Sequence, residues 1–167
     1  KEGSGVRPIV RDNAGTWEYN TAVDVAGYAI SSATYDNVSY GINPAVHDDL
    51  NGMVFSADGT KMYTIGPNTN SIYQHSLSSA FDISTASYNN VSLNINGVDT
   101  AGIAIAFKPD GTKMYMSGGT NDRLYQFSLS TAYDLSTATY DNIFTTIGGA
   151  FPYQVVFKSD GTKAFLV

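Results

Sequence analysis

The sequence has no cysteine, few charged residues and no long apolar run. Only 14% of its 167 residues are charged, and none is Cys. The absence of cysteine excludes a disulfide framework, a thiolate zinc site and a cysteine nucleophile. No apolar run approaches the roughly 18 residues of a membrane-spanning helix, so we expect no membrane insertion. The chain starts at Lys1 without an initiator Met or a hydrophobic signal segment, which indicates a mature or excised chain.

Cationic and catalytic side chains are also scarce. Nine Lys and Arg against fifteen Asp and Glu give a net charge of -6, and there are only two His. A negative chain repels polyanions, so nucleic acid is not an expected partner. The nucleophile elbow, the phosphate loop and the dinucleotide fingerprint are all absent. These absences predict that the chain is not an enzyme and has no catalytic residue, no cofactor and no metal site.

What remains is typical of β-structure. The chain has 12 Tyr, 16 Gly and 13% aromatic residues, and its polar residues are mostly Ser, Thr, Asn and Asp. Aromatic residues favour strands, whereas Gly, Asn, Asp and Ser favour tight turns. Its length suits one domain or one piece of a larger domain.

Internal repeats indicate the architecture. The string Asp-Gly-Thr-Lys recurs with spacings of 52 and 50 residues, starting at Asp58, Asp110 and Asp160. A second block, Tyr-(Asp/Asn)-Asn, recurs with spacings of 53 and 52 residues, starting at Tyr35, Tyr88 and Tyr140. A period near 50 residues is typical of an array of similar structural units.

Each unit has the pattern of four antiparallel strands. The complete second unit predicts strands at Gly52–Ser56, Thr60–Ile65, Ile72–Ser78 and Asn90–Ile95. Asp-Gly pairs supply the positive-φ turn between the first two strands. Four strands in about 50 residues is the size of a propeller blade. We therefore predict an all-β fold, a β-propeller of four-stranded antiparallel blades.

Two motifs resemble a known group of repeats. Phe-x-x-Asp-Gly-Thr-Lys-(Met/Ala)-(Tyr/Phe) and Tyr-Gln-x-Ser-Leu-Ser, within residues 31–167, resemble propeller repeats of the Asp-Gly-Thr-Lys-Met-Tyr type. Such repeats occur in phage tail and virion proteins and in bacterial or archaeal surface proteins, and they are akin to the YVTN propeller repeats. The resemblance implies a binding or structural module without a shared catalytic motif, located outside the cell, on the cell surface or on a virion.

The repeats divide the chain into about three blades. The expected parts are an N-terminal arm or edge strand (1–15), a partial first blade (16–51), a second blade (52–101), a third blade (102–153) and two strands of a further blade (154–167). Within the first blade, residues 15–19 could be a degenerate second strand, although the spacing to Tyr35 is too short for a normal hairpin. Three blades are too few for a closed ring, which needs about four to eight.

An incomplete ring leaves strand edges that need partners. The chain is therefore either a fragment or is completed by another copy, as a dimeric six-bladed ring or as a fibre. Strand addition would use apolar residues near the two ends. The assembly candidates are Val6, Ile9, Val10, Phe165, Leu166 and Val167.

A binding face is predicted from the loops that vary between repeats. Loops that join the second strand to the third, and the fourth to the next blade, emerge on the same side of an up-and-down sheet. Function concentrates on variable loops that a rigid frame holds. The candidates are His47, Asp48, Asp49, Asn68, Asn70, Asp99, Asn121, Asp122 and Tyr153.

Two smaller motifs suggest a cation site and glycosylation sites. The cluster from His47 to Asp49 could bind a divalent cation, but adjacent residues seldom converge on one ion, and an acidic loop is favoured. Asn37 and Asn90 each begin an Asn-x-Ser sequence and are candidate glycosylation sites.

These observations predict a non-enzymatic structural or attachment protein, extracellular or on a virion surface, which assembles with other copies through blade or strand complementation. One alternative is a lectin-like propeller that binds a surface glycan. Another is a metal-dependent propeller hydrolase or lactonase, which would need several carboxylates or amides converging on a central ion.

Overall fold

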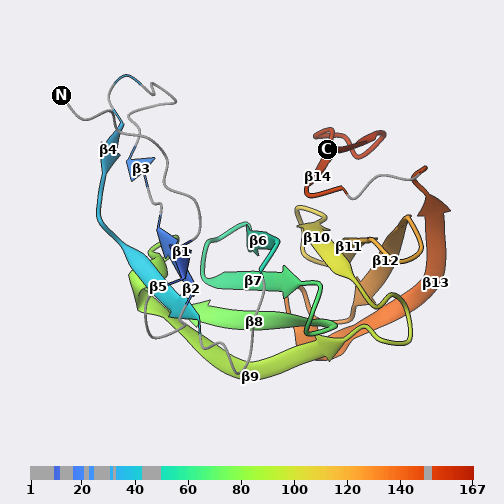
Figure 1. Cartoon of the computed structure of the whole chain (residues 1–167), viewed down its shortest axis with the longest axis horizontal. Helices are drawn as coiled ribbons and strands as arrows, with labels where there is room; N and C mark the ends of the chain where they lie inside the picture. Colours follow the sequence, from blue (N-terminus) through green and yellow to red (C-terminus); the bar gives the residue numbers. More distant parts are fainter. Residues whose placement is uncertain are drawn as a thin grey trace.

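The computed structural model describes residues 10–11, 17–20, 23–24, 31, 33–42, 50–148 and 152–167. Two four-stranded antiparallel sheets form its centre and stand side by side in an arc (Figure 1). The first sheet contains β6 (Gly52–Phe55), β7 (Lys61–Gly66), β8 (Ser71–Leu77) and β9 (Ala86–Asn94). The second contains β10 (Gly102–Phe107), β11 (Lys113–Gly118), β12 (Arg123–Leu129) and β13 (Ala138–Thr146). We call them blade 2 and blade 3.

In both blades the strand order follows the chain, so that the first strand is innermost and the fourth outermost. The four predicted strands are present, and the predicted all-β fold is confirmed. The fourth strand, β9, begins at Ala86, four residues earlier than the sequence predicts. A bulge explains the difference, because Asn90 has φ 57° and the register with β8 shifts between Gln74 and His75. The residue at positive φ looked like the end of a turn but lies inside the strand.

The N-terminal three-stranded sheet differs from its predicted strand assignment. β1 (Val10–Arg11) pairs with β2 (Trp17–Asn20), and β2 pairs with β5 (Ser39–Ile42). A small pair next to it contains β3 (Val23–Asp24) and β4 (Thr34–Tyr35). By repeat position β4 and β5 are the fourth strand, so β2 is the third strand and not a degenerate second one.

Within the predicted N-terminal arm or edge strand, Val10 lies in β1. Its backbone pairs with β2 of the same chain, with Val10 opposite Glu18, and it lies at the edge of the sheet. Val6 and Ile9 lie outside the described residues. Self-association through these residues stays a prediction.

The core lies between the blades. Ile65 and Ile72 of blade 2 and Met114 and Phe127 of blade 3 belong to one cluster of buried side chains. Tyr63 and Ile65 alternate along β7, and Met114 and Met116 alternate along β11, so one face of blade 2 packs on the opposite face of blade 3. Blades 2 and 3 therefore share a single hydrophobic core.

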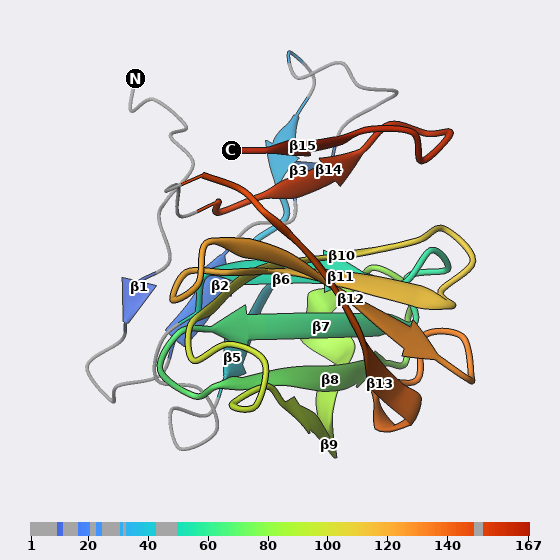
Figure 2. The ribbon, with the colours of Figure 1, turned by 90° about the vertical axis from the view of Figure 1, so that its right-hand side faces the viewer.

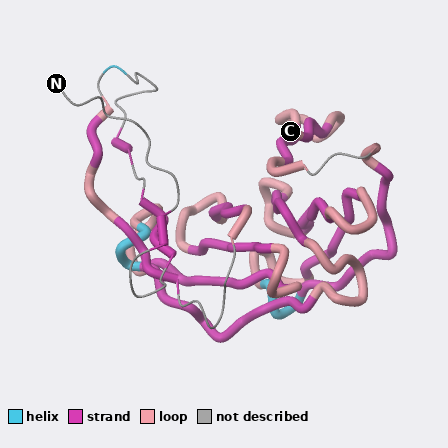
Figure 3. The backbone as a smooth tube through the Cα atoms, viewed as in Figure 1, coloured by secondary structure: helices cyan, strands magenta, loops and turns pink. Residues whose placement is uncertain are grey.

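A short helical turn joins the third and fourth strands of each complete blade (Figure 3). The turns are η2 (Ile83–Thr85) and η3 (Leu135–Thr137). Asp82 and Asp134 cap them, and each carboxylate accepts a hydrogen bond from the backbone N–H two residues later. Leu135 of η3 is buried in the core shared with blade 2, and Ile83 of η2 packs with Val38, which precedes β5 of the N-terminal sheet.

A hairpin of β14 (Val155–Phe157) and β15 (Ala164–Leu166) follows blade 3 and lies next to β10 (Figure 2). Val155 and Leu166 pack with Ala104 and Leu124 of blade 3. The assembly candidate Phe165 is 55% exposed. Val167 is also exposed, and its backbone pairs with that of Gln154.

Among the described residues, no helix is long and apolar enough to cross a membrane.

Candidate functional site

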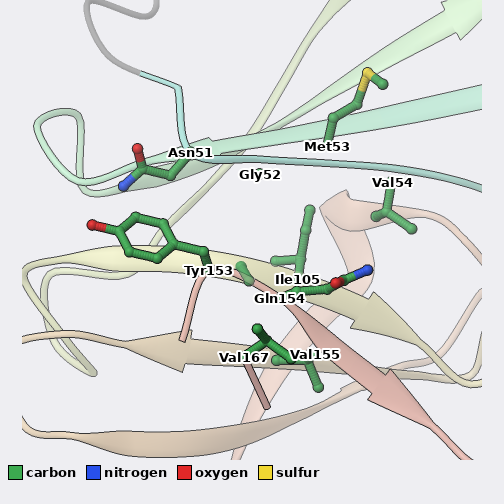
Figure 4. Close-up of a pocket in the computed structure, with 10 residues that line it drawn as sticks. Asn51, Gly52, Met53, Val54, Ile105, Tyr153, Gln154, Val155 and Val167 are labelled. Carbon is green, nitrogen blue, oxygen red and sulfur yellow. The ribbon is translucent and has the colours of Figure 1, made fainter. Parts of the chain in front are cut away.

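The inner strands of three successive units converge on a cavity of about 440 Å³. It lies on the concave side of the arc, where β6, β10 and β14 face one another (Figure 1). The lining residues are Asn51, Gly52, Met53, Val54, Ala104, Ile105, Tyr153, Gln154, Val155 and Val167. Asn51 and Tyr153 lie together at one end of the cavity, and Val54 and Gln154 lie toward the other (Figure 4).

The cavity is formed by equivalent positions of the repeat. When the repeats are aligned on Phe55, Phe107 and Phe157, Asn51 aligns with Tyr153 and Gly52 with Gln154. These positions begin the innermost strand of each unit, which explains why they meet at the centre of the arc. Their residue types differ between repeats, whereas the turns behind them are nearly identical. The same repeated strands and turns therefore place a different side chain from each unit at the cavity.

The polar groups of the cavity are neutral. Asn51 and Gln154 supply amides and Tyr153, which is 63% exposed, supplies a hydroxyl. No side chain of the described lining carries a carboxylate, imidazole, ammonium or guanidinium group. Amides and hydroxyls both donate and accept hydrogen bonds, which suits an uncharged ligand rich in hydroxyl or carbonyl groups.

No group of three or more His, Asp or Glu within the described part of the chain is arranged to hold a metal ion. The predicted cluster His47, Asp48 and Asp49 lies outside the described residues. In the sequence it ends two residues before Asn51, which lines the cavity.

The predicted binding face contains a structural carboxylate. Asp99 is 2% exposed and lies in the loop between blades 2 and 3. Its oxygens accept hydrogen bonds from the backbone N–H groups of Ala101, Thr120 and Asn121, from the Asn121 amide and from the Tyr125 hydroxyl. Burial acts to raise the pKa of Asp99, but these hydrogen bonds outweigh it and leave the pKa below its ordinary value.

Asp99 therefore ties the inter-blade loop to the turn at Asn121, and it is not available to a ligand at the surface.

The two sets of variable loops do lie side by side, since the hydroxyls of Thr100 and Thr120 are 2.8 Å apart. The candidates Asn70 and Asp122 are the positive-φ residues of equivalent turns, with φ 48° and 51°. Their carbonyl groups accept backbone hydrogen bonds from the start of the next loop. Asn68 is exposed beside Asn70.

Asn37 and Asn90, the glycosylation candidates, are exposed and have φ 59° and 57°. Asn142 has φ 57° at the third equivalent position, although it is not followed by the glycosylation pattern. Asn tolerates the left-handed region better than most residues do. The recurrence of Asn thus has a conformational cause, and glycosylation stays a prediction.

Of the predicted binding-face residues that the structure describes, only Tyr153 lines the cavity, and the assembly candidate Val167 lines it as well. Asn51 and Gln154 were missed because they lie at the start of inner strands, where we predicted packing only. The signal was present in the repeats. Aligning them on the Phe of the first strand identifies these positions as the variable ones within an otherwise repetitive frame.

Comparisons with known proteins extend these observations. No family model and no curated protein matches the sequence. Among solved structures, a proposed 6-phosphogluconolactonase of Bacteroides uniformis has a TM-score of 0.59 at 14% identity over 95% of this chain. A proposed 6-phosphogluconolactonase of Bacteroides fragilis has a TM-score of 0.58 at 15% identity over 77% of this chain. The periplasmic gluconolactonase of Pseudomonas aeruginosa has a TM-score of 0.55 at 14% identity, also over 77%.

These likenesses establish the fold as that of a β-propeller, of which the chain forms an incomplete ring. The chain spans between 33% and 46% of the length of these three neighbours. They overturn two predictions, that of a structural or attachment protein and that of a chain without enzymatic activity. The neighbours are named as lactonases and not as attachment proteins.

Proposed function

We propose that this chain is part of a propeller hydrolase of the lactonase type. The observation that carries the proposal is the cavity of about 440 Å³ at the convergence of β6, β10 and β14. Ligand sites in proteins are concave, with an apolar lining and a few convergent polar groups. Two structures with the same fold are named as 6-phosphogluconolactonases and a third as a gluconolactonase, which supports a cyclic ester as substrate.

The neutral lining favours an unphosphorylated sugar lactone. The amides of Asn51 and Gln154 and the Tyr153 hydroxyl can hydrogen-bond the lactone carbonyl and ring hydroxyls. A phosphate group would call for Lys, Arg or a helix N-terminus, and the described lining provides none of them.

Hydrolysis also needs a group that takes a proton from the attacking water. Water adds to the lactone carbonyl, the ring C–O bond breaks, and the released alkoxide takes a proton to give the hydroxy acid. His47 and Asp48 are the titratable residues nearest in sequence to Asn51, and we propose to test them as the base.

The test measures hydrolysis of gluconolactone and of 6-phosphogluconolactone by the full chain, against the uncatalysed rate. We expect faster turnover of the unphosphorylated substrate. Tyr153→Phe should lower kcat/KM about tenfold, because one hydrogen bond is lost from the site. His47→Ala and Asp48→Ala identify the base through kcat.

Tyr35→Phe is the matched control, because Tyr35 is 50% exposed and lies outside the cavity. If neither lactone is hydrolysed above the uncatalysed rate, or if Tyr35→Phe and Tyr153→Phe lower activity equally, the proposal is wrong. Adding a chelator to the assay tests the metal-dependent form of the hypothesis, which predicts loss of turnover.

We also propose a location outside the cytoplasm. One structural neighbour is a periplasmic enzyme, and the repeats resemble those of surface proteins. Fractionation of the source cells, followed by detection of the chain with an antibody, tests this location. Recovery with the cytoplasmic fraction alone would contradict it.

A further inference from the structure

Blade 3 has one face that is covered over only half of its width. Ala104, Tyr115 and Leu124 on this face pack against Val155 and Phe157 of the β14–β15 hairpin. Farther from the centre, Ile143 on the outermost strand is 55% exposed. We call this outer half, defined by Lys113, Gln126, Asp141 and Ile143, the open face.

The equivalent face of blade 2 shows how the repeat covers this surface. There the positions of Lys113, Gln126 and Ile143 are occupied by Lys61, Gln74 and Val91. Gln74 is 4% exposed, and Val91 packs against the shared core. The same repeat position is therefore buried in blade 2 and open in blade 3.

The segment that covers blade 2 is the turn of blade 3 at Tyr133–Thr137. The Gln74 side-chain carbonyl accepts a hydrogen bond of 2.8 Å from the Leu135 backbone N–H. The Lys61 ammonium donates a hydrogen bond of 2.8 Å to the Tyr133 carbonyl. The Gln74 and Lys61 side chains thus hold two neighbouring peptide groups of the turn. The Leu135 side chain is buried in the shared core.

On the open face the same two side chains bond within their own blade. The Gln126 amide donates to Asp141 at 2.6 Å, and the Lys113 ammonium donates to Asp141 at 2.9 Å. Blade 2 has Asn89 at the position of Asp141, and the Asn89 amide donates a hydrogen bond of 2.6 Å to the Ser76 hydroxyl. Asp141 therefore holds Gln126 and Lys113 in place while their carbonyl and ammonium groups remain within reach of a partner.

We propose that the open face binds a polypeptide segment carrying another copy of the Tyr-Asp-Leu-Ser-Thr turn. In the bound state Gln126 accepts the N–H of the incoming Leu, Lys113 donates to the carbonyl of the incoming Tyr, and Ile143 packs against the Leu side chain. The interface continues one that the chain already forms twice, at η2 on the N-terminal sheet and at η3 on blade 2. It does not depend on the proposed enzymatic activity.

The test uses the full chain and a synthetic peptide with the sequence of residues 130–140, monitored by two-dimensional NMR. We expect saturable shifts of the Gln126 side-chain amide and of the Ile143 backbone amide. Ile143→Asp is suited to the test because the side chain is exposed and the fold does not need it. This variant should weaken peptide binding about tenfold.

Two controls accompany the measurement. A peptide with Asp at the Leu135 position should not bind, because the buried side chain becomes charged. Lys158→Met, which alters an exposed lysine of the C-terminal hairpin, should bind the peptide as the unchanged chain does.

Three outcomes would overturn the proposal. The first is no saturable shift up to the solubility limit of the peptide, and the second is shifts confined to other surfaces. The third is saturable shifts of the same size with the control peptide that carries Asp at the Leu135 position, because binding would then not depend on the apolar side chain of the turn.

Discussion

At the scale of single residues, the Asp-Gly-Thr turns depend on a ring placed against a glycine. Gly111 has φ +71°, and an added Cβ would lie 2.3 Å from the Tyr133 ring. Tyr133 itself has φ 58°, which is costly for an aromatic residue. Gly161 has the same φ in the equivalent turn, but nothing lies within 4 Å of the added Cβ. Substituting Gly161 therefore tests backbone strain alone, whereas substituting Gly111 tests backbone strain together with steric overlap.

We predict that Gly161→Ala lowers the free energy of unfolding by about 1 kcal/mol, the cost of the left-handed conformation. Gly111→Ala should cost about 2–4 kcal/mol, because the Tyr133 ring must also move. Urea denaturation followed by circular dichroism gives both values. Equal losses in the two variants would show that the ring contact is unimportant.

His75 is a second residue whose environment determines a measurable property. It is 1% exposed, and burial lowers its pKa from 6.5 to about 4. Its ring nitrogens contact the Tyr40 hydroxyl at 3.3 Å and the Thr64 hydroxyl at 3.2 Å. The equivalent residue of blade 3 is Phe127, so the position accepts an apolar ring.

We predict that the protein loses stability as the pH falls from 6.5 to about 4. In this range the unfolded chain binds a proton at His75 and the folded protein does not, so protonation favours unfolding by at most about 3 kcal/mol. His75→Phe should remove this part of the pH dependence. Denaturant midpoints at about pH 7 and pH 4.5 test it, and an unchanged difference between them in the variant would contradict the assignment.

At the scale of strands and turns, the sequence predicted four strands per blade because each is bounded by strong turn residues. It placed the start of β9 wrongly, since Asn90 at positive φ belongs to a bulge. A local pattern does not distinguish a bulge from a turn, because both use the same residue in the same conformation. The pairing of β2 with β5 was missed for another reason, because strand neighbours depend on contacts distant in sequence.

The turn η3 provides the next prediction. Gln74→Leu removes the acceptor of the Leu135 N–H and leaves that buried group without its partner, which costs about 1–3 kcal/mol. Gln126→Leu is the matched variant in blade 3, where the side chain is only partly buried. We expect it to cost less than about 1 kcal/mol. Thermal unfolding of both variants tests the difference, and a larger loss for Gln126→Leu would refute this account of the blade interface.

At the scale of the whole molecule, the repeat predicted the propeller but not the cavity. The period and the turn chemistry are properties of the frame, and they recur in every unit. The cavity arises from positions such as Asn51 and Tyr153, which lie together only when the inner strands of successive units converge. Their significance depends on the arrangement of the blades, which no single repeat encodes.

The shared core of blades 2 and 3 leads to a prediction about cooperativity. Ile65 and Ile72 of blade 2 are buried in the same cluster as Met114 and Phe127 of blade 3. Opening either blade exposes apolar side chains of the other, so the strands β7, β8, β11 and β12 should open together. In the hairpin, by contrast, Val156 and Phe165 are 45% and 55% exposed. We expect β15 to open locally and at lower cost.

Hydrogen exchange measured by mass spectrometry tests this prediction. Amides in β7, β8, β11 and β12 should exchange with the same free energy as global unfolding, and those of β15 should exchange sooner. Gly111→Ala provides the decisive comparison, because the substitution lies in blade 3. If the blades unfold as one unit, it lowers protection in β7 and β8 as much as in β11 and β12. Reduced protection in β11 and β12 alone would mean that each blade unfolds independently and that the common core does not couple them.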